Sequence, residues 1–177
     1  PDFDLNKPFE IYDKKTKRAI NKLSGEEKTT ALIEAQQEQW RNKAVSDVYE
    51  PGSVFKIVTG SAAIEENATS IDSHFYCPGY IQIANRRIRC HKHEGHGGQN
   101  LMQAFQNSCN PAFITMGQKL GAQKFSRYFE AFGLTQKTGI DIPGESTSYY
   151  HLENKMGPTE LASSSFGQTF TITPIQI

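Results

Sequence analysis

Long hydrophobic runs are missing from this chain. None of its 177 residues belongs to an unbroken apolar stretch of the roughly 18 residues or more that indicate a membrane-spanning helix. Nothing in these residues reads as a signal peptide either. If the protein is exported or anchored, we expect the responsible segment to lie outside these residues.

A net charge is also missing. Nineteen basic and nineteen acidic side chains cancel, so no overall field points to nucleic acid or to an anionic membrane as a partner. Hydrophobic residues make up 37% of the chain and charged residues 21%. This is the composition of an ordinary globular domain, or of part of a larger one.

Cysteine is scarce, with only Cys77, Cys90 and Cys109. An odd number excludes a fully paired disulfide framework. One disulfide with a free thiol, or metal ligation, remains open at this point.

Local patterns in the first half predict an extended stretch followed by two helices. Residues 1–20 have the composition of an extended, turn-rich segment that ends in a basic cluster. Ser24 and Glu27 have the spacing of a capping box, which predicts a helix from there to about Ala44. Pro51-Gly52 then breaks the chain before a second helix begins at Ser53. Apolar side chains cover most of the circumference of that second helix, which is typical of a buried helix: Val54, Phe55, Ile57, Val58, Ala62, Ala63 and Ile64.

The second half begins with a predicted hairpin, because apolar and polar side chains alternate along residues 75–90 as they do in paired strands. Residues 100–107 predict a short helix. Pro111 suits the first turn of the next helix, which should stop at Gly121, and a further amphipathic helix should end at Gly133.

The stretch YEPGSVFK places a lysine three residues after a serine. Positions three apart are neighbours on a helix, so Ser53 and Lys56 can come within hydrogen-bond reach. A serine hydroxyl needs a base to become a nucleophile, and burial lowers the pKa of a lysine until it can act as that base. The alternative is a capping serine beside a lysine that reaches to solvent, which is the more common meaning of so short a motif.

A second stretch, NSCNPAF, places Ser108 and Asn110 in a loop between two predicted helices. The hydroxyl could relay a proton and the carboxamide could hold a substrate amide. Serine and asparagine also occur commonly as helix caps in such turns. We interpret Cys109 between them as a packing residue beside the site.

Together these residues resemble the S-x-x-K and S-x-N signatures of penicillin-binding transpeptidases. PDFDLN, GHGGQN, GIDIPGE and SFGQTFTITPIQ resemble the class B, monofunctional branch of that family, especially its sporulation-type enzymes in clostridia. The resemblance implies an α/β fold, the penicillin-binding-protein/β-lactamase-like serine transpeptidase fold, in which helices flank an antiparallel sheet. Residues 1–177 would form a partial transpeptidase domain, rich in helix and lacking most of the sheet.

The resemblance also implies roles for four residues. Ser53 would be the acylated nucleophile, Lys56 its base, Ser108 a proton relay and Asn110 a substrate clamp. The family's third signature, K-T/S-G, is expected beyond residue 177. The K-T-G at residues 137–139 lies where the family has a connecting segment, so we interpret it as a chance match.

Residues 70–98 form a hairpin insertion between the two motifs and are rich in cysteine and histidine. A hairpin would bring Cys77 and Cys90 together, and thiolate and imidazole ligands suit zinc. We expect a structural zinc ion held by Cys77, Cys90, His93 and Asp72, with His91 and His74 as substitutes and His96 as a structural residue. A disulfide, which some relatives have at similar positions, and unpaired thiols among surface histidines are the alternatives.

The function implied by the resemblance is a peptidoglycan D,D-transpeptidase. It would cross-link stem peptides through a Ser53 acyl-enzyme and would be a target of β-lactams, in cell-wall or spore-cortex synthesis. A penicillin-sensing domain without turnover, a serine β-lactamase and a metal-stapled structural domain are the alternatives. The expected partners are stem peptides, β-lactams and a glycosyltransferase of the wall-synthesis machinery. The expected location is the extracytoplasmic face of the bacterial membrane, with an N-terminal anchor outside this chain.

Overall fold

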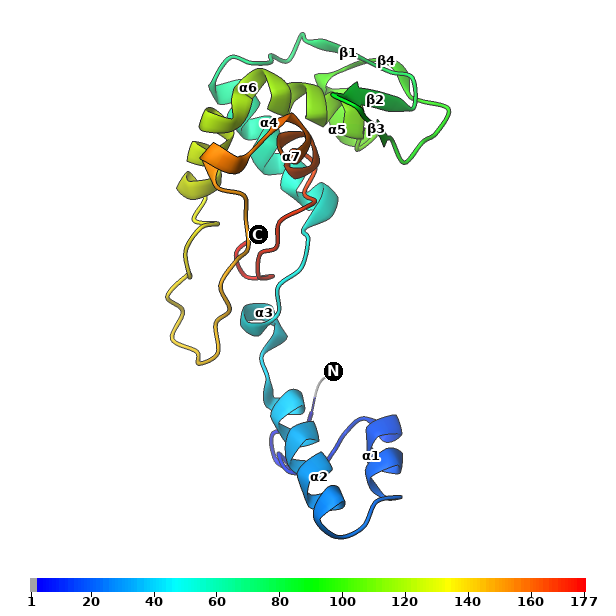
Figure 1. Cartoon of the computed structure of the whole chain (residues 1–177), viewed down its shortest axis with the longest axis vertical. Helices are drawn as coiled ribbons and strands as arrows, with labels where there is room; N and C mark the ends of the chain where they lie inside the picture. The colour runs from blue at the N-terminus through cyan, green and yellow to red at the C-terminus, as the bar shows by residue number, and fades with distance from the viewer. Residues whose placement is uncertain (1–2) are drawn as a thin grey trace.

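A computed structural model describes residues 3–177 of the chain. Most of its regular structure is helical, and its strands form two small two-stranded antiparallel sheets. In Figure 1, α1 and α2 lie at one end of an elongated molecule, α3 lies between, and the other elements form the body at the opposite end. The expectation of a helix-rich chain with little sheet is confirmed.

The helices before the first strand are α1 (Lys14–Ile20), α2 (Gly25–Trp40), α3 (Lys43–Ser46), η1 (Gly52–Phe55) and α4 (Lys56–Glu65). The strands are β1 (His74–Cys77), β2 (Tyr80–Ile83), β3 (Arg86–Arg89) and β4 (Gly97–Asn100). The remaining helices are α5 (Leu101–Gln106), α6 (Asn110–Ala131), η2 (Glu153–Lys155) and α7 (Pro158–Ser164).

The N-terminal unit departs from the sequence prediction in two ways. A helix, α1, forms within residues 1–20, because the Asp13 carboxylate accepts the Thr16 N–H at 2.6 Å as an N-cap and Ile20 is buried. The predicted helix to Ala44 ends instead at Trp40, and the Ser24 side chain makes no capping bond. The indole N–H of Trp40 donates to Pro8 O at 2.7 Å, which ties the end of α2 to the segment before α1.

The helix predicted to begin at Ser53 forms as a 3₁₀ turn, η1, followed by α4, and these two elements are buried on one side only. Phe55, Val58, Ala62 and Ala63 are buried, as the sequence predicts. Three other apolar residues predicted to be buried are exposed by about half or more: Val54 (52%), Ile57 (61%) and Ile64 (48%). The reason is that α4 packs against α6 along one face, and no described element covers the opposite face.

An aromatic cluster fixes the start of this helix. The ring of Phe55 lies 4.7 Å from that of Phe170, 5.7 Å from Phe129 and 6.0 Å from Phe125, measured between centroids. Aromatic pairs at such separations contribute beyond the area they bury. The residues next to Ser53 are therefore held by α6 and by the C-terminal segment together.

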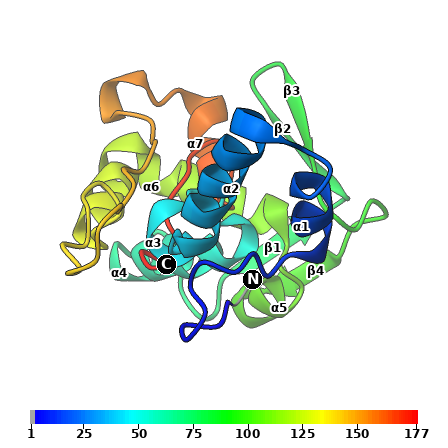
Figure 2. The same cartoon turned by 90° about the horizontal axis from the view of Figure 1, so that it is seen from below.

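The hairpin predicted over residues 75–90 is confirmed for β2 and β3, which pair antiparallel, whereas residues 75–77 belong to β1 and pair elsewhere. Its apolar face, formed by Ile81, Ile83 and Ile88, packs against a buried cluster that includes Ile114 and Phe166. β1 pairs with β4 in a second sheet, with Cys77 opposite Gly97. Seen from below in Figure 2, the β2–β3 hairpin projects at one edge of the body.

The helices around the second motif also follow the sequence. Asn100 and Gln103 form a capping box at the start of α5. Pro111 lies in the first turn of α6. Gly121 has φ 77° and ψ 162°, so it breaks α6 into the two helical stretches that the sequence predicts.

Candidate active site and metal centre

Ser53 lies in a tight turn that the C-terminal segment supports. The backbone N–H of Gly52 donates to Gly167 O at 2.9 Å. A Cβ at position 167 would lie 2.0 Å from Gly52 O, so only glycine allows this approach. Two residues after Gly167, the Thr169 N–H donates to the Glu50 carboxylate at 2.9 Å. Segments far apart in the sequence thus fix the backbone on which Ser53 stands.

Lys56 brings the two predicted motifs together. Its side chain is buried, and the residue is only 3% exposed. Its Nζ lies 3.2 Å from Ser53 Oγ, 2.9 Å from Ser108 Oγ, 2.7 Å from Ser108 O and 2.7 Å from Asn110 Oδ1. All four residues predicted as catalytic therefore meet at one nitrogen atom.

The hydrogen-bond partners of Lys56 Nζ favour a neutral amine. Four oxygen atoms surround Nζ, but an ammonium group has only three protons to donate. A neutral amine can donate to the two carbonyl oxygens, Ser108 O and Asn110 Oδ1, and turn its lone pair toward a serine hydroxyl. In that arrangement Ser53 or Ser108 donates its proton to Lys56, which is the geometry a general base requires.

Burial favours the same neutral form of Lys56. Desolvation lowers its pKa from the ordinary 10.5 to about 8, while the charges of Cys90 and Cys109 oppose that shift. A lysine with such a pKa is partly neutral at physiological pH. The geometry and the electrostatics therefore agree on a base.

The depressed pKa of Lys56 predicts a pH profile. Acylation of Ser53 should rise about tenfold per pH unit below pH ~8 and level off above it, because only unprotonated Lys56 accepts a proton. Between about pH 8 and 10.5 the folded state holds fewer protons on Lys56 than the unfolded state does, so the Lys56 contribution to stability rises with pH across that window. Stopped-flow acylation by a β-lactam, measured from pH 6 to pH 10 on the intact protein, checks the profile. A rate that is flat across this range would contradict it.

The second motif lies in a strained turn between α5 and α6. Ser108 adopts a positive φ of 46°, a region that non-glycine residues rarely occupy. The turn is held because the Ser108 N–H donates to Phe105 O and the Cys109 N–H to Ala104 O, at 2.9 and 3.0 Å. The Asn110 amide also reaches Arg89 O at 3.4 Å. Backbone strain of this kind is often concentrated at functional sites.

The K-T-G at residues 137–139 has a different role in the structure. The Glu145 carboxylate accepts the Thr138 N–H and the Thr138 hydroxyl, both at 2.6 Å, and the Gly139 N–H at 3.2 Å. The Thr138 side chain is the main reason why the pKa of Glu145 lies below its ordinary value. These bonds close an exposed surface loop, and none of them reaches Ser53, Lys56 or Ser108.

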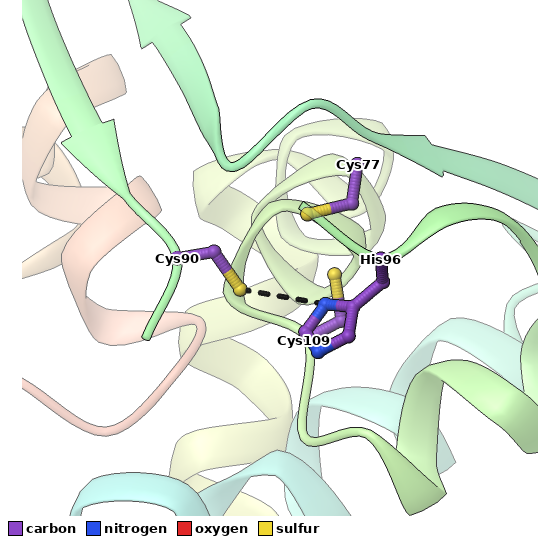
Figure 3. Close-up of side chains that lie close together, drawn as sticks. All are labelled: Cys77, Cys90, His96 and Cys109. Atoms are coloured by element: carbon purple, nitrogen blue, oxygen red, sulfur yellow. Dashed lines mark hydrogen bonds between the residues drawn. The ribbon is translucent and has the colours of Figure 1, made fainter. Parts of the chain in front are cut away.

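Three thiols and an imidazole come together next to the Ser108 turn, two thiols and the imidazole from residues 70–98 and the third thiol, Cys109, from the turn before α6 (Figure 3). The candidate ligand atoms of Cys77, Cys90, His96 and Cys109 all lie within 4.8 Å of one another. The cysteines are at most 1% exposed. Cys90 Sγ lies 3.7 Å from His96 Nδ1. Such a set of sulfur and nitrogen donors could bind a metal ion.

This cluster contains two of the four ligands that the sequence predicts, Cys77 and Cys90. His93 and Asp72 are exposed and do not belong to it, and the substitutes His91 and His74 are exposed as well. Their places are taken by His96 and Cys109, which sequence reasoning had assigned to structure and packing. The sequence did contain a signal for Cys109. Once Cys77 and Cys90 are assigned to one metal site, the third cysteine of the chain is left as a further candidate sulfur ligand.

Strand pairing explains why His96, and not His93, belongs to the cluster. Cys77 lies opposite Gly97, so the residue before Gly97, His96, comes next to the Cys77 thiol. The approach is close: a Cβ at Gly95 would lie 2.2 Å from Cys77 O. His93 lies in the connection between Cys90 and β4, and its side chain points to solvent.

The direction in which the surroundings shift the pKa differs among the side chains of the cluster. Burial is the main cause that raises the pKa of the Cys109 thiol to about 12. Burial also acts to raise the pKa of Cys77, but the backbone N–H groups of His96 and Gly79 outweigh it, with help from neighbouring thiols, and the pKa is lowered. Burial, aided by His91, Lys92 and Lys56, lowers the pKa of His96. A neutral imidazole is the form that ligates metals.

Within residues 3–177, no helix is both long enough and apolar enough to cross a membrane.

Comparison with known proteins identifies the family. Residues 9–177 match the model of the penicillin-binding protein transpeptidase domain. The chain is 44% identical over 137 residues to the Stage V sporulation protein D of Bacillus subtilis, covering 77% of this chain and 21% of that protein. It is 31% identical over 147 residues to the peptidoglycan D,D-transpeptidase MrdA of Acinetobacter baumannii, covering 77% of this chain and 22% of that protein.

A solved structure shows the same fold. The penicillin-binding protein PBP2 of Helicobacter pylori, determined in complex with MreC, superposes with a TM-score of 0.75 at 24% identity, over 86% of this chain and 30% of that one. The chain therefore belongs to the family of penicillin-binding protein transpeptidase domains. It spans about a fifth of the length of the curated relatives named above.

Proposed function

We propose that these residues carry the nucleophile of a peptidoglycan D,D-transpeptidase, an enzyme that cross-links stem peptides. The observation that supports this most directly is the meeting of Ser53, Ser108 and Asn110 at the buried Lys56 Nζ. Family membership supports the same activity. Residues 1–177 would then be part of the catalytic domain, with residues 70–98 as an insertion and the third signature beyond residue 177.

In the proposed acylation, the Ser53 hydroxyl gives its proton to Lys56, and its oxygen attacks the carbonyl of the penultimate D-alanine. The amide bond then breaks, and the proton passes through the Ser108 hydroxyl to the leaving amine of the terminal D-alanine. Asn110 can hold the amide of the bound peptide through its carboxamide. An acceptor amine finally attacks the Ser53 ester, releasing the cross-linked product and returning the proton to Ser53.

A β-lactam would follow the first half of the same path. Ser53 attacks the lactam carbonyl, and the ring C–N bond breaks. The amine formed remains attached to the acyl group, so it does not diffuse away as D-alanine does. Substitutions in the Ser53 and Ser108 turns would then be candidates for altered β-lactam sensitivity.

Labelling of Ser53 tests the proposed function. A fluorescent penicillin should label the intact protein on Ser53, and Ser53→Ala should abolish labelling. Ser61→Ala, at an exposed serine of the following helix α4, is the matched control and should label normally. Retained labelling in Ser53→Ala, with circular dichroism showing an intact fold, would reject Ser53 as the nucleophile. Release of D-alanine from a D-Ala-D-Ala peptide with an amine acceptor separates a transpeptidase from a sensor without turnover.

We further propose that the cluster of Cys77, Cys90, His96 and Cys109 holds a structural zinc ion. A donor set of three sulfurs and one nitrogen is the type that closed tetrahedral zinc sites use. The spread of 4.8 Å among the ligand atoms is compatible with one ion bound by all four, given Zn–S distances of about 2.3 Å. The ion would join β1, β3 and the turn before α6, and would take no part in the acyl transfer.

Removing this zinc should destabilise the protein. The binding energy of a structural zinc contributes to folding, so chelation or His96→Ala is expected to lower the melting temperature by about 10 °C or more. His93→Ala, at the exposed histidine, is the matched control and should keep both metal and stability. Elemental analysis under reducing conditions should find about one zinc per chain. Absence of metal together with a Cys77–Cys90 disulfide in mass spectrometry would favour the disulfide instead.

The biological setting is also a proposal. Similarity to a sporulation protein supports a role in cell-wall or spore-cortex synthesis. The site would then face the outside of the bacterial membrane, held by an N-terminal anchor, and would act with a partner glycosyltransferase.

A further inference from the structure

Gln99 is a buried amide between the cysteine–histidine cluster and the turn that carries Ser108. It belongs to β4 and is only 3% exposed. Its partner on β1 is Phe75, and side chains alternate along a strand, so Gln99 and Phe75 share the inward face of this sheet with Cys77. Phe75, Cys77 and Cys109 belong to one buried cluster. A polar side chain in such surroundings needs a partner at both ends of its amide.

One end of the Gln99 amide has a partner and the other end has none. The side-chain amide of Asn107 donates to Gln99 Oε1 at 3.1 Å. Gln99 Nε2 is buried and has no hydrogen-bond partner of ordinary geometry among residues 3–177. A buried donor that lacks an acceptor is unfavourable. We therefore looked for an acceptor in the cluster beside it.

The sulfur of Cys109 is the candidate acceptor. Burial raises the pKa of the Cys109 thiol to about 12, and hydrogen bonding by the Gln99 side chain is among the effects that oppose this rise. The amide of Gln99 thus lies within reach of the sulfur. A neutral thiol accepts hydrogen bonds only weakly, whereas a metal-bound thiolate accepts charge-assisted ones. Metal ligation by Cys109 would supply the acceptor that Nε2 lacks.

The two ends of the Gln99 amide reach both sides of Ser108. Asn107 precedes Ser108 and Cys109 follows it. Ser108 has a φ of 46°, and its hydroxyl lies 2.9 Å from Lys56 Nζ. A backbone conformation of this kind persists only where the surrounding structure holds it. Gln99 is placed to hold the residues on either side of the proposed proton relay.

We propose that Gln99 is a positioning residue that links the metal site to the proton relay. Its Nε2 donates to the metal-bound Cys109 thiolate, and its Oε1 accepts from Asn107. The turn that carries Ser108 is thereby held on both sides. This inference rests on the proposed zinc site and on the proposed transpeptidase function. Gln99 acts only through its two neighbours and takes no part in the acyl transfer.

Cobalt substitution reads the hydrogen bond to the sulfur. The intact protein is loaded with Co²⁺ in place of zinc, and its thiolate-to-cobalt charge-transfer band is recorded. Gln99→Met has a side chain of similar length but no N–H, so the band should move to longer wavelength, because the hydrogen bond stabilises the sulfur lone pairs. Zinc affinity, measured by competition with a chelator, should fall about tenfold. Gln106→Met, at an exposed glutamine that ends α5, is the matched control and should change neither.

Penicillin acylation of Ser53 tests the link to the Ser108 turn. Gln99→Met should slow it roughly tenfold, the scale of one lost hydrogen bond. The loss should lie in the acylation rate constant more than in the affinity of the initial complex, since the relay moves a proton during acylation. Asn107→Ala removes the bond to Gln99 Oε1 alone, so it should slow acylation several-fold and leave the cobalt band in place. Asn107 is exposed, so this variant also serves if Gln99→Met does not fold.

The outcomes separate this inference from the two proposals on which it rests. If penicillin does not label wild-type Ser53, or if the wild type binds neither zinc nor cobalt, the corresponding proposal fails and the role of Gln99 with it. If both proposals hold, an unchanged cobalt band and zinc affinity in Gln99→Met would overturn only the role of Gln99. Acylation within about twofold of the wild type in both Gln99→Met and Asn107→Ala would overturn it as well.

Discussion

Replacing Lys56 with methionine is expected to slow β-lactam acylation of Ser53 by roughly 10²–10⁴-fold, the range that a positioned general base contributes. Methionine keeps a long side chain in the same buried position but has no lone pair that can take the serine proton. The acylation rate of the intact variant, followed by stopped-flow fluorescence, is the measurement. An effect of only a few-fold would show that Lys56 is structural.

The matched control is Lys137→Met, in the exposed K-T-G loop. The hydrogen bonds that close this loop join Thr138 and Gly139 to the Glu145 carboxylate and do not involve the Lys137 side chain. The acylation rate should therefore match that of the wild type. A loss comparable to that of Lys56→Met would place this K-T-G in the active site. The stability of Lys56→Met is a separate readout, because the change removes a desolvated amine but leaves Ser108 O and Asn110 Oδ1 without its donors.

Replacing Gly167 with alanine is expected to destabilise the fold by roughly 2–4 kcal/mol and to slow acylation about a hundredfold. The new Cβ would lie 2.0 Å from Gly52 O and 2.7 Å from Gly52 N, and both are backbone atoms that cannot rotate away. The φ of +86° at this position is a second penalty for a side chain. Because Gly52 precedes Ser53, relief of the clash moves the nucleophile away from Lys56.

Gly133→Ala is the control for the backbone penalty alone. Gly133 has a φ of +74°, and a Cβ there meets nothing within 4 Å. It should cost about 1 kcal/mol and leave acylation unchanged. Melting temperature and acylation rate are measured on both variants. Equal acylation in the two variants would mean that the contact between residues 52 and 167 does not position Ser53.

The meeting of the two motifs at Lys56 was predictable because each motif depends on local sequence. Lys56 follows Ser53 by three positions across the junction of η1 and α4, and Asn110 follows Ser108 by two positions, so each spacing fixes its own pair. The family resemblance then joined the two halves. The Pro51-Gly52 break, the Gly121 kink and the β2–β3 hairpin were also recognisable, since each rests on the conformational limits of a few adjacent residues.

The cysteine–histidine cluster was only half predictable, because its geometry depends on the pairing of residues far apart in the sequence. Cys77 and Cys90 flank one hairpin, so their approach follows from it. His96 reaches them only through the pairing of β1 with β4, and Cys109 only through the turn before α6. The exposed face of α4 was missed for a similar reason, because an apolar helix does not reveal which of its faces the described chain covers.

Ser108, Cys109 and Asn110 alternate between two centres in three consecutive positions. The outer two reach Lys56, and the middle one joins the cysteine–histidine cluster. Because these three residues contact both centres, replacing them with the corresponding residues of a relative changes both centres at once. A chimera that imports a different residue at position 109 also needs matching residues at positions 77, 90 and 96, so the turn at residues 108–110 and the segment that carries Cys77, Cys90 and His96 are expected to be inherited as one unit.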